Sequence, residues 1–367
     1  MNGEPRRGGG GGGERAMVPD AKVLSYYDQP VLKPPVWRWP IPAYFFAGGL
    51  AGASATLALA ARVTGNDRLA RRALLASSAA IAVSPVLLVE DLGRPERFAN
   101  MLRVLKPTSP MNTGAWLLAV MGPAVAGATA SDLTGAARRT GRGLEMLAGA
   151  LGPVLATYTA VVVSDTAVPA WHEARRELPF VFAAGSAASA GAAATLLTPG
   201  DDGAPARRMA VVGALAALAA ARAMVRAMHE EVAAPYRTGR AARLSRWAEA
   251  LSAGGAALLA LSRRRPLAMA GAGAVLAGTA VERFAVAEAG AASARDPRAT
   301  VGAQRRRMAG REPPHEPAHG PTREATTGRT TPTTTEATTE PTTEATTDRT
   351  TAPTTQPGGS TTRSPPA

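Results

Sequence analysis

The chain has 367 residues, of which 46% are hydrophobic and only 19% are charged. The charged residues fall in clusters between long uncharged runs, a distribution typical of a chain whose solvent is lipid, which argues against a soluble enzyme. The formal net charge of +13 comes from basic clusters between apolar runs or near the termini, so membrane loops explain it without a nucleic-acid partner.

The first 36 residues contain a six-glycine run, Gly8 to Gly13, followed by prolines, and show no apolar period. We predict a disordered arm over residues 1–36. This arm lacks the basic start and apolar stretch of a signal peptide, so we expect the first span after it to serve as the insertion signal.

For residues 37–302 we predict an all-α integral membrane domain with about eight transmembrane helices. About 20 residues are needed to cross a hydrocarbon core roughly 30 Å thick. The apolar runs that meet or approach this length are 41–61, 73–89, 111–131, 146–164, 178–200, 209–225, 247–262 and 266–281. The last three runs are shorter, and Arg222 and Glu249 fall inside two of them, so seven or nine spans are the alternatives.

The predicted spans are rich in alanine and glycine. In lipid, small residues let helix backbones approach closely and so supply much of the packing. Gly48 and Gly52, with Gly49 beside them, form such a small-residue motif in the first span. We therefore expect this span to pack closely against its neighbours.

After about residue 303 the chain consists mainly of Thr, Pro, Glu and Arg, with the near-repeat TTEATTEPTTEATTD. Such a stretch buries too little apolar surface to offset the entropy of ordering it, so we predict a disordered tail over residues 303–367. Its Thr/Pro content is typical of O-glycosylated segments outside the cell.

The sequence contains no cysteine and only four histidines. Without cysteine the chain holds no iron–sulfur cluster, thiolate metal site or disulfide. Only His172 and His229 lie near apolar helices, and both lie at predicted helix ends. We therefore expect neither a haem with two facing axial ligands nor another metal site.

The most informative stretch is SPVLLVEDLGRPERFANMLRVLKPTSPM, residues 84–111. Glu90 and Asp91 lie where the second span ends, and residues 93–97 follow with alternating charge and tight-turn residues. These charges either pair locally at a solvated membrane edge or reach a docked subunit. Under the second interpretation the candidate partner-binding residues are Arg94, Glu96, Arg97 and Lys106.

Three segments resemble a known family: WPIPAYFFAGGLAGAS at 39–54, DLGRPERFANMLRVLKPTSPMNTGAW at 91–116 and VERFAVAEAGAASARDP at 281–297. They are similar to the NrfD-type membrane subunit of the polysulfide reductase family. The resemblance implies a multi-helix anchor that exchanges electrons between a membrane quinone or quinol, of the menaquinone or ubiquinone type, and an iron–sulfur subunit. That subunit in turn serves a molybdopterin catalytic subunit. A chain without cysteine fits this role.

A quinone headgroup presents two carbonyl oxygens, so its site needs hydrogen-bond donors and a route for two protons. With eight spans, the N-terminus, the C-terminus and the loops after the second, fourth and sixth spans share one face. This arrangement brings Trp39, Tyr44, Asp91, Trp116 and Asp165 to the same edge of the bundle.

Tyr158 lies seven residues before Asp165, two turns deeper on the same side of a predicted helix. The resemblance implies that a tyrosine here contacts the quinone, so Tyr158 is the first candidate for headgroup donor. Tyr44, Trp39 and Trp116 are further cofactor-binding candidates. An interfacial tyrosine with its hydroxyl satisfied inside the protein is the alternative.

Asp91 and Asp165 are the candidates to pass protons, because an ionisable group at membrane depth is costly and points to function. Helix capping or ion pairing would explain them equally well. Some relatives carry a histidine at the start of the first span as a second quinone ligand. This chain has Trp39 to Pro42 there, and Tyr44 is the candidate to replace the histidine.

Charges in the later spans have simpler interpretations. Arg222 and Arg226 are four residues apart and share a helix face, where long side chains extend towards the membrane interface. Pairing with Glu230 or a buried carboxylate is the alternative. Glu282 and Arg283 follow the last predicted span, and we expect them to form an interfacial ion pair.

Two other functions stay open. A polytopic transporter would have broken helices, which Pro85, Pro123 and Pro153 could mark, although prolines are tolerated in membrane helices. A passive anchor would hold partners and bind no quinone. We expect a multi-pass protein of the cell membrane. Lys/Arg counts in the loops of the two faces are nearly equal. The basic terminal arms favour a cytoplasmic N-terminal face, whereas the Thr/Pro tail and the usual arrangement of the family favour the extracytoplasmic N-terminal face that we expect.

Overall fold

The computed structural model describes residues 31–35, 37–92, 95–262 and 264–309, and every regular element in these ranges is a helix. The long helices are α1 (Pro40–Val63), α2 (Asp67–Leu92), α4 (Pro110–Thr134), α5 (Arg138–Ser164), α7 (Leu178–Leu197), α8 (Ala204–Ala227), α10 (Gly239–Leu261) and α11 (Arg265–Arg295). The short ones are α3 (Pro95–Met101), α6 (Pro169–Glu173), α9 (Glu230–Arg237), α12 (Pro297–Ala309) and the 3₁₀ turns η2 (Ala174–Arg176) and η3 (Asp201–Gly203).

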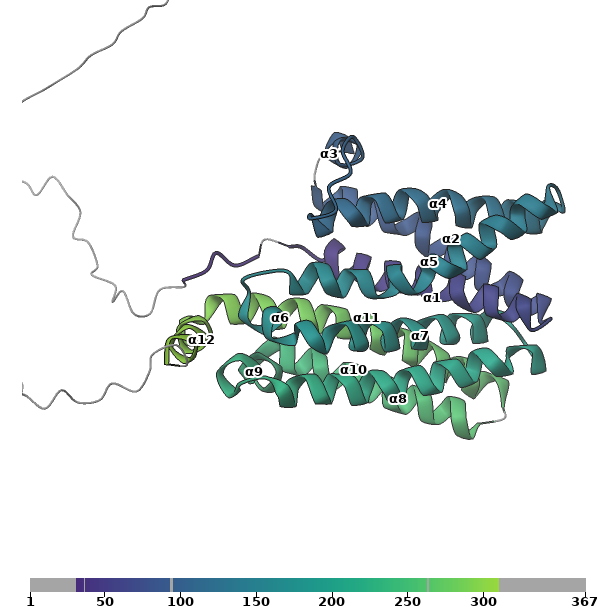
Figure 1. Ribbon diagram of the computed structural model, residues 1–367. Coiled ribbons are helices and arrows are strands. Elements are labelled where there is room, and N and C mark those ends of the chain that lie inside the picture. The colour runs from purple at the N-terminus through teal and green to yellow at the C-terminus, as the bar shows by residue number, and fades with distance from the viewer. Residues whose placement is uncertain (1–30, 36, 93–94, 263, 310–367) are drawn as a thin grey trace, which may run out of the picture. The chain divides into compact units, whose positions relative to one another are not determined.

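The long helices pack side by side in a bundle (Figure 1). In its first half α1 packs against α2 and α5, and α4 packs against α5; in its second half α7 packs against α8, and α10 packs against α11. Contacts among α1, α7 and α11 join the two halves. The short helices α3, α6, α9 and α12 lie at the end of the bundle where α1 begins, which we call the N-terminal face.

Within the described ranges, seven helices are long and apolar enough to cross a membrane: α1, α2, α4, α5, α7, α8 and α11. The eighth long helix, α10, has a charged first half and an apolar second half, and it lies against α8 and α11. Each predicted apolar run coincides with one of these eight helices. The predicted all-α membrane fold with about eight spans is confirmed.

Close backbone contact between α1 and α5 depends on two glycines. A Cβ atom at Gly52 would overlap the carbonyl oxygen of Gly152, and a Cβ atom at Gly152 would overlap that of Gly52. Gly49 faces Ser186 of α7, whereas the only atom near a Cβ at Gly48 belongs to Tyr44 of the same helix. The small-residue motif of the first span therefore contacts two different neighbours through Gly49 and Gly52, and Gly48 takes no part.

The three prolines inside predicted spans leave their helices continuous. Pro85, Pro123 and Pro153 lie within α2, α4 and α5, each of which extends for two turns or more beyond its proline. The broken helices that a transporter interpretation placed at these prolines are therefore not found there. Pro153 has no N–H for the carbonyl of Gly149, and the hydroxyl of Thr56 on α1 donates to that carbonyl at 3.1 Å, one way in which membrane helices satisfy a group freed by a proline.

An ion network joins four helices at the end opposite the N-terminal face. Its centre is Arg62 of α1, whose side chain is only 11% exposed. The guanidinium lies 2.8 Å from Asp67 of α2, 2.8 Å from Asp132 of α4 and 3.1 Å from Glu145 of α5. Arg71 and Arg142 complete the network at 2.7 Å from Asp132 and 3.3 Å from Glu145. One arginine thus links the four helices of the first half.

Beyond the bundle, α12 follows α11 after Asp296 and contacts α6, α9 and α11 at the N-terminal face. The predicted start of the tail after residue 302 falls inside this helix. Most of both predicted disordered arms, residues 1–30 and 310–367, lies outside the described residues.

Candidate functional site

A cavity of about 70 Å³ lies at the N-terminal face, among the ends of α1, α2, α4 and α5. Most of its lining is apolar, and its polar groups are Tyr44, Asp91 and Tyr158. These side chains come from α1, α2 and α5. The fold thus brings together three polar groups that are far apart in the sequence, in an apolar site next to a helix-end surface, which is the usual composition of a small-molecule site.

Tyr158 is held between α5 and the first turn of α4. Its hydroxyl donates a hydrogen bond to the carbonyl of Pro110, the first residue of α4. Its ring packs against Gly114, where a Cβ atom would overlap the ring, so the glycine lets α4 approach it. Tyr158 and Tyr44 are both buried, and both line the apolar cavity.

Asp91 forms the polar edge of this cavity at the end of α2. Its Oδ1 accepts a hydrogen bond from the backbone N–H of Arg38 at 3.4 Å. The Arg38 guanidinium donates to the Glu90 carbonyl at 2.7 Å and lies 3.7 Å from the Glu90 carboxylate. The segment before α1 is thereby fixed to the end of α2, and Asp91 lies between solvent and the cavity.

A loop over residues 102–109 covers the start of α4, and Asn112 holds it there. The Asn112 side-chain amide donates to the carbonyls of Met101 and Val104, and its oxygen accepts from the N–H of Lys106. Trp116, one turn further along α4, directs its Nε1 towards the Val104 carbonyl at 3.5 Å. Trp116 thus lies against this loop and does not line the cavity.

The structure separates the predicted site residues into two groups. Tyr44, Asp91 and Tyr158 line one cavity. Trp39 lies at the N-cap of α1, 61% exposed and away from the cavity, and Asp165 is an exposed residue at the C-cap of α5. The five residues that we expected at one edge therefore do not form one ring around the cavity, although all lie near the N-terminal face.

The tryptophan that lines the cavity is Trp37, which sequence reasoning did not select. Its ring stacks on Trp171 of α6 with centroids 4.8 Å apart and meets the edge of Phe45 at 5.9 Å. Positions 37, 41 and 45 are four residues apart, and all three side chains line the same cavity. That four-residue spacing was the signal available in the sequence.

Comparison with protein families agrees with this architecture. The family model described as Polysulphide reductase, NrfD, matches residues 29–293, which include the cavity and nearly all of the eight-helix bundle. The chain belongs to the NrfD family. A comparison with curated proteins gave no match. NrfD proteins are membrane anchor subunits of oxidoreductase complexes, and this is the role of the chain.

Of the four candidate partner-binding residues, Glu96 and Arg97 lie on α3 and Lys106 lies on the following loop, and all three are exposed. Arg97 also donates to the Leu92 carbonyl at 3.1 Å, which fixes α3 to the end of α2. Arg94 lies outside the described residues.

Glu282 and Arg283 form the predicted pair, with Nη1 of Arg283 3.5 Å from Oε2 of Glu282, but the pair is buried inside the bundle and does not lie at a solvated interface. Both lie well inside α11, which continues fourteen residues past Val281 to Arg295. Arg283 is 2% exposed, and its guanidinium lies 3.7 Å above the Phe182 ring and donates to the Phe182 carbonyl at 2.9 Å. We took the charges as the end of the span, but burial and local pairing let the helix continue through them.

Proposed function

We propose that this NrfD subunit binds a quinone or quinol in the cavity beside Tyr158 and exchanges electrons with an iron–sulfur subunit, which serves a molybdopterin catalytic subunit. The observation that carries the proposal is the meeting of Tyr44, Asp91 and Tyr158 in one apolar cavity at a membrane edge. The site offers hydroxyl donors for the headgroup and a carboxylate for protons, which are the two chemical requirements of quinone binding.

The cavity fits such a ligand if its entrance widens. A volume of about 70 Å³ corresponds to roughly two water molecules, less than a quinone ring occupies. Met101 and Met111 are part of the lining, and unbranched thioether side chains adapt readily to a ligand. The Tyr158 hydroxyl is already held by the Pro110 carbonyl, so a headgroup oxygen would take over or share this donor.

The residues of the chain have separate tasks in this proposal. When bound, a quinone carries two electrons and two protons. Tyr158 and Tyr44 hold the headgroup oxygens, and the apolar walls keep water from the ring. Asp91, placed between the cavity and solvent, accepts or releases protons. Iron–sulfur clusters need cysteine ligands, which this sequence lacks, so the electrons must pass to clusters in another polypeptide.

The partner surface and the orientation complete the proposal. We assign docking of the iron–sulfur subunit to the N-terminal face, where Glu96 and Arg97 of α3 and Lys106 of the following loop are exposed. Electron transfer then crosses only the short distance between the cavity and the docked subunit. We place this face outside the cytoplasm, in the cell membrane, with bilayer lipids around the bundle.

A Tyr158→Phe variant tests the proposal in the purified complex. We expect normal assembly, unchanged activity with a soluble dye that delivers electrons to the partner subunits, and a loss of quinol-linked activity of about tenfold or more, since one positioned donor is removed. Thr157→Val is the matched control, because the Thr157 hydroxyl bonds only to carbonyls of its own helix. Full quinol-linked activity in Tyr158→Phe would favour a passive anchor.

A further inference from the structure

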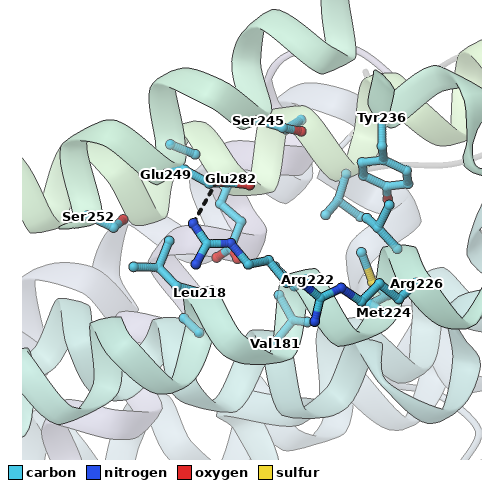
Figure 2. A pocket seen from close by; sticks show the side chains of 16 residues that line it. Val181, Leu218, Arg222, Met224, Arg226, Tyr236, Ser245, Glu249, Ser252 and Glu282 are labelled. Carbon is cyan, nitrogen blue, oxygen red and sulfur yellow. Dashed lines mark hydrogen bonds and ion pairs between the residues drawn. The ribbon is translucent and has the colours of Figure 1, made fainter. Parts of the chain in front are cut away.

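A second and larger cavity lies in the other half of the bundle. It has a volume of about 230 Å³ and is lined mainly by α8, α10 and α11, with Tyr236 of α9 near one end (Figure 2). Most of its walls are apolar, with Leu218, Val225 and Val286 among them. None of the residues that line the Tyr158 cavity lines this one, so the two cavities are separate features of the bundle.

The residues of α10 place the opening of this cavity at the membrane surface. The first half of α10 contains three exposed arginines, at positions 240, 243 and 246. Trp247 follows and is 64% exposed, and α10 contains no charge after Glu249. Exposed tryptophan is typical of the boundary between headgroups and hydrocarbon. Glu249 pairs with Arg222 at 3.2 Å, so the same boundary crosses α8 near Arg222.

From this boundary the cavity extends along the helices into the hydrocarbon layer. Its lining on α8 runs from Ala217 to Arg226, which corresponds to about 14 Å at 1.5 Å per residue. The deep end on α8, at Ala217 and Leu218, is apolar. An apolar protein cavity of about 150 Å³ accommodates the six carbons of benzene, so 230 Å³ has room for about nine carbons. An elongated apolar space of this size fits roughly half of a lipid acyl chain.

One positive charge at the rim of the cavity lacks a partner. Arg222 is paired with Glu249, and Figure 2 shows this pair beside Arg226. Glu282 is paired with Arg283 at 3.5 Å, so both carboxylates that line the cavity are neutralised. Arg226 is exposed and forms no ion pair or hydrogen bond with any residue in the described ranges. The rim therefore carries a net charge that favours an anion.

A lipid phosphate is the anion that an arginine at headgroup depth meets, and guanidinium groups bind phosphate oxygens through paired hydrogen bonds. We propose that this cavity binds an anionic phospholipid of the phosphatidylglycerol class, with its phosphate on Arg226 and one acyl chain between α8, α10 and α11. A zwitterionic lipid has the same phosphate, but its amine meets only carboxylates that are already paired, those of Glu249 and Glu282. The inference does not rest on quinone binding beside Tyr158.

A phosphatidylglycerol with a diazirine in one acyl chain tests the proposal on the purified complex in phosphatidylcholine nanodiscs. We expect saturable labelling of α8, α10 and α11. A phosphatidylcholine probe with the same acyl chains should label these helices about fivefold more weakly, because it brings no net charge to Arg226. Arg226→Gln should weaken phosphatidylglycerol labelling about tenfold, since a charge-assisted hydrogen bond is lost. Arg243→Gln is the matched control, because Arg243 is exposed on α10 and does not line the cavity.

Further arms separate the acyl chain from the headgroup. Ala221→Phe places a ring in the cavity and should abolish labelling although Arg226 is intact, whereas Tyr158→Phe changes the other cavity and should leave labelling unchanged. Excess inorganic phosphate should not compete with the probe. Competition by phosphate would assign the site to a free anion and overturn the proposal. Equal labelling by the two lipid probes, unaltered labelling in Arg226→Gln, or no labelling of the three helices at saturating probe would contradict it as well.

Discussion

Replacing Arg62 by glutamine should destabilise the helix bundle more than any exposed arginine substitution. Arg62 is the one residue of its network that contacts acidic groups on three other helices. Its loss leaves Glu145, 5% exposed, and Asp132, 15% exposed, each with a single remaining arginine at 3.3 and 2.7 Å. Breaking a buried ion pair costs about 3–5 kcal/mol. Because Arg142 and Arg71 remain, we expect the low end of that range, about 3 kcal/mol.

Arg68→Gln provides the matched control at the same end of the bundle. Arg68 pairs with Asp202 at 3.1 Å, but the two side chains are 85% and 39% exposed. Exposed pairs contribute about 0–1 kcal/mol, so this variant should stay close to the parent protein. A Glu145→Gln substitution added to Arg62→Gln should restore part of the lost stability, because it removes one of the carboxylates left uncompensated.

Steric trapping in bicelles measures these differences as free energies of unfolding under membrane conditions. We expect Arg62→Gln to be less stable than Arg68→Gln by about 2 kcal/mol or more. Equal stabilities of the two variants would refute the reasoning, since exposure would then not govern the contribution of these ion pairs. A double variant less stable than Arg62→Gln alone would show that Glu145 stabilises the bundle through some other contact.

Two other substitutions test packing and proton transfer. Gly52→Ala should lower the free energy of unfolding by about 1–3 kcal/mol in the same trapping assay, because its Cβ would overlap the Gly152 carbonyl. Gly48→Ala should be nearly neutral. Similar losses of stability in the two variants would mean that α1 and α5 do not pack as described. Asp91→Asn should slow quinol-linked turnover about tenfold or more while dye-linked turnover of the partner subunits stays normal, and unimpaired quinol turnover would exclude Asp91 from proton transfer.

The sequence predicted the membrane helices well, because a helix in lipid must be apolar over about 20 residues and this requirement is visible in any sequence. It predicted their ends less well. α11 passes through Glu282 and Arg283, two charges that a hydropathy argument places outside a span. A tertiary contact lets the helix continue through Arg283, because Phe182 of α7 lies under the Arg283 guanidinium and its carbonyl accepts a hydrogen bond from it. No residue near position 283 in the sequence indicates this contact.

The candidate site was predictable where it depends on helix order and unpredictable where it depends on side-chain direction. Alternation of spans puts the ends of α1, α2 and α5 at one face, which is why Tyr44, Asp91 and Tyr158 meet. Trp39 and Trp116 were expected there for the same reason, yet helix alternation fixes only the membrane face and not the side of each helix. The second cavity was not predictable, because it depends on which sides of α8, α10 and α11 face one another, and helix order does not fix this.

The most direct test of the account follows electrons from quinol to the clusters of the partner subunit. Purified, oxidised complex is mixed with a short-chain quinol, and reduction of the iron–sulfur clusters is recorded by EPR after freeze-quenching. We predict rapid cluster reduction with the parent subunit and with Thr157→Val, and reduction slowed at least about tenfold with Tyr158→Phe. Cluster reduction at the parent rate in Tyr158→Phe would contradict quinone binding in the cavity that this residue lines.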